Sequence, residues 1–205
     1  MKLRMLALGA LAALSFNANA ALTTSTLWDT TYPGIAGVQF NIVQIASLTG
    51  ASLAMGAHPY TSGVTMPNNG VDTYFGTAGL TTPTRANWSF DYAVNYGNCT
   101  NCTAGLFVDV DPTDGVTFRQ LTMYGGIIDS GNLEFVYMSG LAGISYDFDP
   151  FSASSTAFSL RMYDEQGALL GTSDITVNVP EPGSMALLGL GLVGIGAMAR
   201  RRRQR

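Results

Sequence analysis

Apolar and polar residues alternate along residues 87–96, and this alternation constrains the fold more than any other feature of the chain. The apolar positions are Trp88, Phe90, Tyr92, Val94 and Tyr96. Because successive side chains of a β-strand point to opposite faces of a sheet, the pattern predicts a strand with one face in the core. Between residues 21 and 182, no stretch keeps a helical apolar stripe for three turns. We therefore expect the chain to fold mainly into strands.

Further alternating segments divide this region into roughly eight to ten short strands. They lie at residues 38–45, 106–110, 116–118, 133–137, 144–148, 158–162 and 175–179. The last two flank the turn Glu165-Gln166-Gly167 and predict a hairpin. Closely spaced strands without crossover helices predict an all-β fold, an antiparallel β-sandwich or jelly roll. Residues 50–84, rich in Gly, Thr, Pro and Asn, are expected to form loops with one short strand near residues 71–75.

The first twenty residues have the three parts of a secretory signal peptide. These parts are the basic residues Lys2 and Arg4, the apolar run 5–14 and the small residues Ala18 and Ala20. We expect signal peptidase to cut between Ala20 and Ala21 after export by the general secretion machinery. A retained N-terminal anchor is the alternative. With residues 1–20 removed, the exported β domain spans residues 21–179.

The last 27 residues combine an extended motif, a short apolar segment and a basic end. In order, these are Val179, Pro180, Glu181 and Pro182, the apolar residues 185–199, and the basic residues Arg200, Arg201, Arg202, Arg203 and Arg205. The prolines keep the motif extended, so its backbone is accessible to an enzyme. As a helix, the apolar segment would be about 22 Å long, short of a bilayer core of about 30 Å. Arginine side chains compensate by reaching the headgroups, and their charge keeps the tail, residues 200–205, in the cytoplasm.

These three parts, in this order, resemble the PEP-CTERM sorting signal of exported bacterial surface proteins, here residues 180–205. A plain tail anchor is the alternative. The resemblance covers the tail closely and the β domain hardly at all. It implies that an exosortase cuts near the Pro-Glu-Pro motif, so the transmembrane helix holds the protein in the inner membrane only transiently. It also implies a final place at the cell surface, in the extracellular matrix or in the medium, in a cell that makes an exopolysaccharide or biofilm.

The exported region is strongly acidic. It contains all fourteen acidic residues of the chain but only three basic ones, Arg85, Arg119 and Arg161, which gives a net charge of −11. Such a field repels nucleic-acid phosphates, so nucleic acid is not an expected partner. The field would attract divalent cations, although solubility outside the cell is the simpler explanation of the composition.

Cys99 and Cys102 are the only cysteines, and their spacing is C-x-x-C. A redox pair should follow a strand and open a helix, whereas these two lie among turn-forming residues. A zinc site would need two more ligands, and the chain has a single histidine. In an exported protein, we expect the pair to form a local disulfide.

Asp109, Asp111 and Asp114 form the best candidate metal site in the sequence. Calcium prefers several oxygen ligands at alternating positions, together with a glycine for the turn, and Gly115 follows. The spacing departs from that of an EF-hand loop, so an acidic turn between two strands is the alternative. No other cofactor is expected.

Catalytic chemistry has little support in the sequence. His58 falls in the region interpreted as loops, and no Gly-x-Ser-x-Gly elbow is present. Trp28 and Trp88 are candidate platforms for sugar rings, but Trp88 lies on an apolar face, which favours the core. We therefore expect a non-enzymatic surface or extracellular-matrix protein. The alternatives are a lectin-like carbohydrate-binding module, with or without calcium, and, more remotely, a secreted hydrolase.

Overall fold

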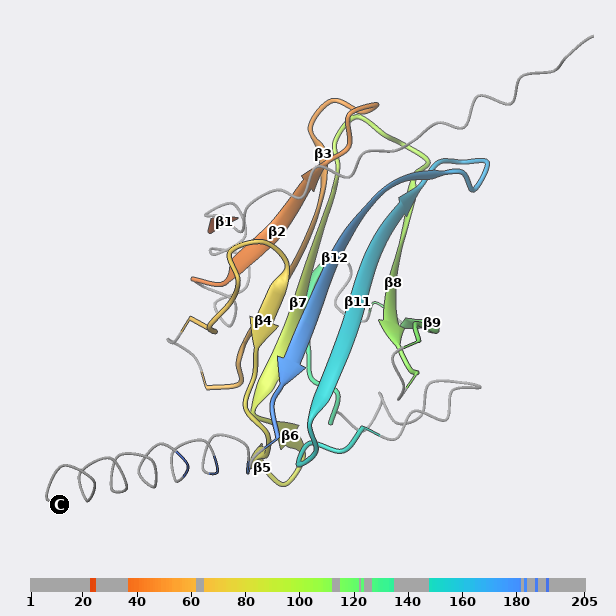
Figure 1. Ribbon diagram of the computed structural model, residues 1–205. Helices are drawn as coiled ribbons and strands as arrows, with labels where there is room; N and C mark the ends of the chain where they lie inside the picture. The colour runs from red at the N-terminus through yellow and green to blue at the C-terminus, as the bar shows by residue number, and fades with distance from the viewer. Residues whose placement is uncertain are drawn as a thin grey trace, which may run out of the picture.

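Two five-stranded β-sheets stack to form a β-sandwich (Figure 1). The computed structural model describes residues 23–24, 37–61, 65–111, 115–121, 123, 127–134, 148–181, 183, 187 and 191. The first sheet has the order β1 (Thr23–Thr24), β2 (Gln39–Gln44), β3 (Ala51–Pro59), β7 (Trp88–Tyr96) and β10 (Ile128–Gly131). The second has the order β4 (Thr73–Phe75), β12 (Leu169–Val179), β11 (Ser154–Tyr163), β8 (Thr103–Asp109) and β9 (Phe118–Leu121). A separate pair joins β5 (Leu80–Thr82) to β6 (Arg85–Ala86).

The core lies between the two sheets and is built from the alternating apolar positions of their strands. On β7, the residues that face the core are Trp88, Phe90, Tyr92 and Val94. From the second sheet, β11 contributes Phe158, Leu160 and Met162, and β12 contributes Ile175, Val177 and Val179. The rings of Phe90 and Phe158 meet at 4.5 Å between centroids. Each fully buried side chain of this size contributes about 1.5–3 kcal/mol, so the interior holds the sheets together.

The alternation predicts most of the strands correctly, and the all-β fold is confirmed. Strands β2, β7 and β8 and the hairpin of β11 and β12 lie where the pattern places them. The short strand near residues 71–75 is β4, but it pairs with β12 in parallel, an exception in otherwise antiparallel sheets. Strand β9 begins at Phe118, later than the 116–118 pattern suggests. Strand β10 was not predicted, and most of the segments expected at 133–137 and 144–148 lie outside the described residues.

The prediction that residues 50–84 are mainly loops is wrong for β3. This nine-residue strand is buried from Ala51 to His58 and pairs with β2 on one side and β7 on the other. A strand buried on both faces need not alternate, and its small residues concealed it from a search for alternation. Gly56 shows how tight the packing is, since a Cβ there would lie 2.8 Å from Val38 Cγ1 and 3.0 Å from the Gln39 carbonyl oxygen.

The two sheets are also joined along one side by hydrogen bonds from the inner face. Asn41 Nδ2 donates to the Asp174 carbonyl oxygen at 2.8 Å, and Ser173 Oγ donates to the Asn41 carbonyl oxygen at 2.7 Å. The Tyr74 hydroxyl donates to the Gln39 carbonyl oxygen, and burial raises the pKa of Tyr74. These bonds lock β2 of the first sheet against β12 and β4 of the second.

The final strand ends at Val179, directly before Pro180, as expected. Val179 is buried and pairs with Ser154, so the domain is complete at this residue. The predicted signal peptide, the basic tail and nearly all of the predicted transmembrane helix lie outside the described residues. Within the part of the chain that the structure describes, there is no helix with the length and apolar character that crossing a membrane requires.

Candidate functional site

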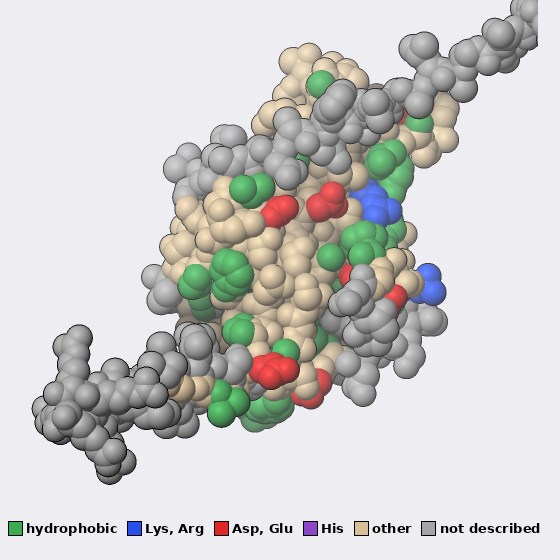
Figure 2. All heavy atoms as spheres, viewed as in Figure 1, with side chains coloured by type: hydrophobic (Ala, Val, Ile, Leu, Met, Phe, Trp, Pro, Cys, Tyr) green, Lys and Arg blue, Asp and Glu red, His purple; other side chains and the backbone are tan. Residues whose placement is uncertain are grey.

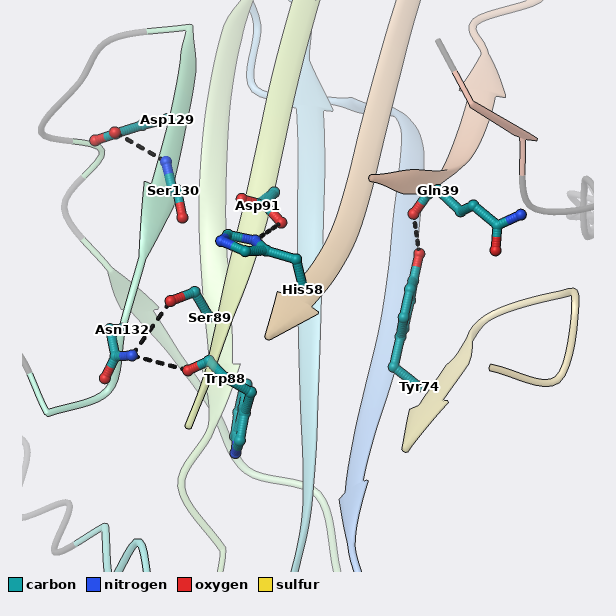
Figure 3. A network of polar contacts seen from close by, with 9 residues as sticks. All are labelled: Gln39, His58, Tyr74, Trp88, Ser89, Asp91, Asp129, Ser130 and Asn132. Carbon is teal, nitrogen blue, oxygen red and sulfur yellow. Dashed lines mark hydrogen bonds and ion pairs between the residues drawn. The ribbon is translucent and has the colours of Figure 1, made fainter. Parts of the chain in front are cut away.

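A buried histidine–aspartate pair lies on the face of the first sheet that points away from the core. His58 Nδ1 of β3 and Asp91 Oδ2 of β7 are 2.7 Å apart (Figure 3). Asp91 is 0% exposed and His58, the only histidine of the chain, is 9% exposed. The prediction that His58 lies in a loop is wrong, because the ladder of β3 and β7 sets His58 opposite Ser89, two residues from Asp91.

Burial and pairing act on the pKa values of this pair in different ways. Burial disfavours the imidazolium form of His58, but the hydrogen bond to Asp91 and its negative charge outweigh this and raise the pKa of His58. Burial also raises the pKa of Asp91, and the contact with His58 only partly offsets it. Ser130 of β10 pairs with Asp91 in the ladder and favours its ionised form, without completing a hydrogen bond to Oδ1.

Asn132 anchors the adjoining end of β10 through a set of buried hydrogen bonds. Its Nδ2 donates to the carbonyl oxygens of Ala86 at 3.0 Å and Trp88 at 2.8 Å, and to Ser89 Oγ at 3.2 Å (Figure 3). Its Oδ1 accepts the backbone N–H of Ala86 at 3.0 Å and that of Glu134 at 3.1 Å. The amide therefore bonds to backbone groups on both strands that flank Asn87, and fixes the turn between β6 and β7.

This arrangement favours a structural role for the pair over catalysis. A general base has to reach a proton of its substrate, whereas Asp91 is completely enclosed and His58 nearly so. The Ser89 hydroxyl oxygen, directly opposite His58, accepts the amide N–H of Asn132. Removing one partner of a buried ion pair destabilises the fold, because the other charge is left buried without a partner. The pair therefore ties β3 to β7.

Sequence reasoning missed Asp91 and Asn132. Asp91 occupies a polar position of the alternating pattern in residues 87–96, which ordinarily indicates a solvent-facing side chain. Its burial arises from tertiary contacts on the second face of the sheet, for which the pattern carries no signal. Asn132 follows Gly131 in a segment without any alternation.

The proposed calcium loop is held together by its own hydrogen bonds. Asp109 Oδ1 accepts the backbone N–H of Asp111 at 3.1 Å and that of Thr117 at 2.8 Å. The Thr117 hydroxyl lies 3.5 Å from Asp111 Oδ2, while Asp114 lies outside the described residues. Across the described ranges, no three His, Cys, Asp or Glu side chains converge as a metal site requires. The bonds of Asp109 also fit an acidic turn, and the calcium site stays a prediction, because Asp114 lies outside the described residues.

Cys99 and Cys102 are joined by a disulfide in the structure, with their Cα atoms 5.7 Å apart. The loop that they close links β7 to β8. It is held against the turn after β2, since Asn98 Oδ1 accepts the Thr49 N–H at 3.0 Å and the Thr49 carbonyl accepts the Asn98 N–H at 3.1 Å. The disulfide therefore stiffens one end of the sandwich.

Trp88 belongs to the core, as its alternating pattern predicts. It is 2% exposed and meets Phe148 and Phe158 edge to face, at 5.9 and 6.2 Å between ring centroids. Its indole is therefore not available to a sugar ring. Trp28, the other candidate platform, lies outside the described residues.

The described strands thus form a β-sandwich, and the last of them, β12, ends directly before Pro180. Residues 178–203 match the family model of the PEP-CTERM protein-sorting motif. The chain therefore carries a PEP-CTERM sorting motif, which indicates export and sorting through this motif and implies processing by an exosortase. The match starts within β12, at Asn178, and leaves the rest of the β domain unassigned. No curated protein and no solved structure matches the chain.

Proposed function

We propose that this chain is a non-enzymatic protein of the cell surface or extracellular matrix, associated with exopolysaccharide in a biofilm. Signal peptidase removes residues 1–20, and the segment 185–199 then holds the protein transiently in the inner membrane. An exosortase cuts near residues 180–182 and releases the β domain. The sorting motif implies processing by an exosortase. The matrix role is inferred from that processing.

The observation that carries the proposal is the position of the motif relative to the last strand. β12 ends at Val179, and every described strand lies before Pro180. Removal of the tail therefore takes no strand from either sheet, and the core between them stays complete. A tail that can be lost without loss of structure is what a temporary sorting device requires.

The sorting step is tested by the mass of the mature protein in strains with and without exosortase. We expect the wild-type strain to give a form that ends near Pro182, and the deletion strain to give a form that keeps the basic tail. In the wild-type strain, replacing Glu181 by alanine should impair cutting, whereas Glu165→Gln, an exposed change in the turn of the β11–β12 hairpin, should not. Identical masses in both strains would contradict the proposal.

The matrix role is tested by fractionation of cultures that do or do not make the exopolysaccharide. We expect the processed protein to sediment with the matrix in the producing strain and to appear in the medium of the other. An equal distribution in both strains would separate sorting, which would stand, from matrix association, which would fail.

A further inference from the structure

Arg161 is one of three basic residues in the acidic exported region. It lies on β11, the central strand of the second sheet, on the face that points away from the core. Its ladder partners on either side are Gly105 of β8 and Thr172 of β12, both small. Neither ladder partner therefore covers the side chain of Arg161, which is partly exposed.

Three contacts fix the position of its guanidinium group. The Cζ atom lies 4.3 Å from the ring centroid of Phe107 and 4.9 Å from that of Phe118, distances at which a cation is attracted to an aromatic ring. Arg161 Nε donates to Ser159 Oγ at 3.0 Å. Gly105 makes this arrangement possible, since a Cβ at that position would lie 2.9 Å from Phe107 Cε2.

These contacts leave the two Nη groups of Arg161 available. Among the residues that the structure describes, Arg161 forms no ion pair, and its hydrogen bond to Ser159 uses Nε alone. Arg85 differs, because its Nη1 donates to Thr84 and its Nε to the Tyr60 hydroxyl. A guanidinium group whose plane is already fixed presents its Nη edge as a fork that matches the two oxygens of a carboxylate.

The surface around this fork is polar and rich in hydroxyl groups. The neighbouring outward-facing side chains of β11 and β12 are Ser155, Ala157, Ser159, Thr172, Asp174 and Thr176, of which Ser159 is buried. Figure 2 shows this side of the molecule, where the surface over β11 and β12 is mostly neither apolar nor charged and basic side chains lie toward β8 and β9. Aromatic rings also lie on this face, since Phe107 and Phe118 flank Arg161, and the hydroxyl groups around them suit a polyhydroxylated ligand.

We propose that the outer face of the second sheet binds a carboxylate-bearing sugar, a uronate unit of an acidic polysaccharide. The Nη groups of Arg161 take the carboxylate, and Thr172, in register with Arg161, lies where a sugar hydroxyl can reach it, whereas buried Ser159 only positions the guanidinium group. The inference rests on the proposed matrix role, for which it supplies a ligand class. Asp174 brings a carboxylate to the same face, where it accepts a hydrogen bond from Thr172 and forms no described ion pair with Arg161, while charges beyond about 8 Å are largely screened at physiological salt.

The test titrates the purified mature protein with trigalacturonate and with neutral galactotriose, followed by calorimetry. We expect trigalacturonate to bind about tenfold more tightly, the gain of a charge-assisted pair of hydrogen bonds. Arg161→Gln should remove this difference, and Arg161→Lys, which keeps the charge without the fork, should remove most of it. Arg119→Gln is the matched control, since it makes the same charge change on the exposed part of β9 and should leave binding unchanged.

Three results would overturn the proposal. Equal binding of the two sugars, or no binding of either, would show that Arg161 does not select a carboxylate. An equal loss in the Arg119→Gln and Arg161→Gln variants would show a general effect of charge. Binding of triglutamate as tight as that of trigalacturonate would assign the site to protein carboxylates instead. Unfolding midpoints of all variants exclude loss of the fold, and none of these results bears on sorting by the tail.

Discussion

Replacement of His58 by leucine should destabilise the domain by an amount that depends strongly on pH. The change leaves Asp91 without its partner at a position that is 0% exposed. An ionised carboxylate is too costly there, so the carboxyl of the variant takes up a proton on folding. At pH 7 this costs about 4 kcal/mol, from about 1.36 kcal/mol for each pH unit above an unfolded pKa of about 3.9. At pH 5 the same relation gives about 1.5 kcal/mol.

The stability of the wild-type protein also depends on pH, and this reduces the difference between the cost at pH 7 and the cost at pH 5. Because the folded pKa of His58 is raised, its contribution to stability is fully present below the unfolded pKa of about 6.5. That contribution is lost as the pH rises through the folded pKa. The raised pKa of Asp91 acts in the same direction, since the folded protein holds the proton more tightly. We therefore expect the cost of His58→Leu to be about 2 kcal/mol smaller at pH 5 than at pH 7.

Urea unfolding and thermal unfolding of the mature protein, with its disulfide intact, measure this cost. The fluorescence of buried Trp88 reports the loss of the core. At pH 7 the melting temperature of the His58→Leu variant should fall by about 8–16 °C, from about 2–4 °C for each kcal/mol in a domain of this size. The double variant that also carries Asp91→Asn lacks this carboxyl, so the part of the pH dependence that comes from its protonation should vanish. A cost that is equal at pH 5 and pH 7 would refute the reasoning.

Two further substitutions test the contacts around this pair by the same unfolding assay. Asn132→Ala should cost about 2–3 kcal/mol, because buried backbone groups of β6 and β7 lose their hydrogen-bond partner. The same substitution should speed hydrogen exchange of the Ala86 amide. An unchanged exchange rate would contradict the role of Asn132. Gly131→Ala should cost about 1–3 kcal/mol, because its Cβ would lie 2.3 Å from Phe90 Cζ; a midpoint equal to that of the unsubstituted protein would show that the ring of Phe90 moves aside freely.

The strands that sequence predicts are those with one buried face. In β7 and in the hairpin of β11 and β12, apolar residues alternate because only one face meets the core. In β3 this signal is absent, since Ala54 packs on one face while Leu53 and Met55 pack on the other. Short edge strands such as β10 hold too few residues for a period to be visible.

Some of the candidate sites can be recognised in the local sequence, whereas others depend on contacts between residues that are far apart in the sequence. The disulfide and the sorting motif are local in sequence, so spacing alone indicates them. The pairing of His58 with Asp91 joins positions 33 residues apart on neighbouring strands. The cluster of Phe107, Phe118 and Arg161 likewise needs three strands to be in register, which no local pattern of residue types encodes.

The two ends of the β11–β12 hairpin lie beside different features of the chain. At one end Val179, the last residue before the tail, pairs with Ser154. At the other end Tyr163 pairs with Thr103, which follows the Cys99–Cys102 loop. The strand between these ends spans about 30 Å at about 3.3 Å per residue. The start of the sorting motif, at the end of β12, and the disulfide loop therefore lie at opposite ends of the sandwich.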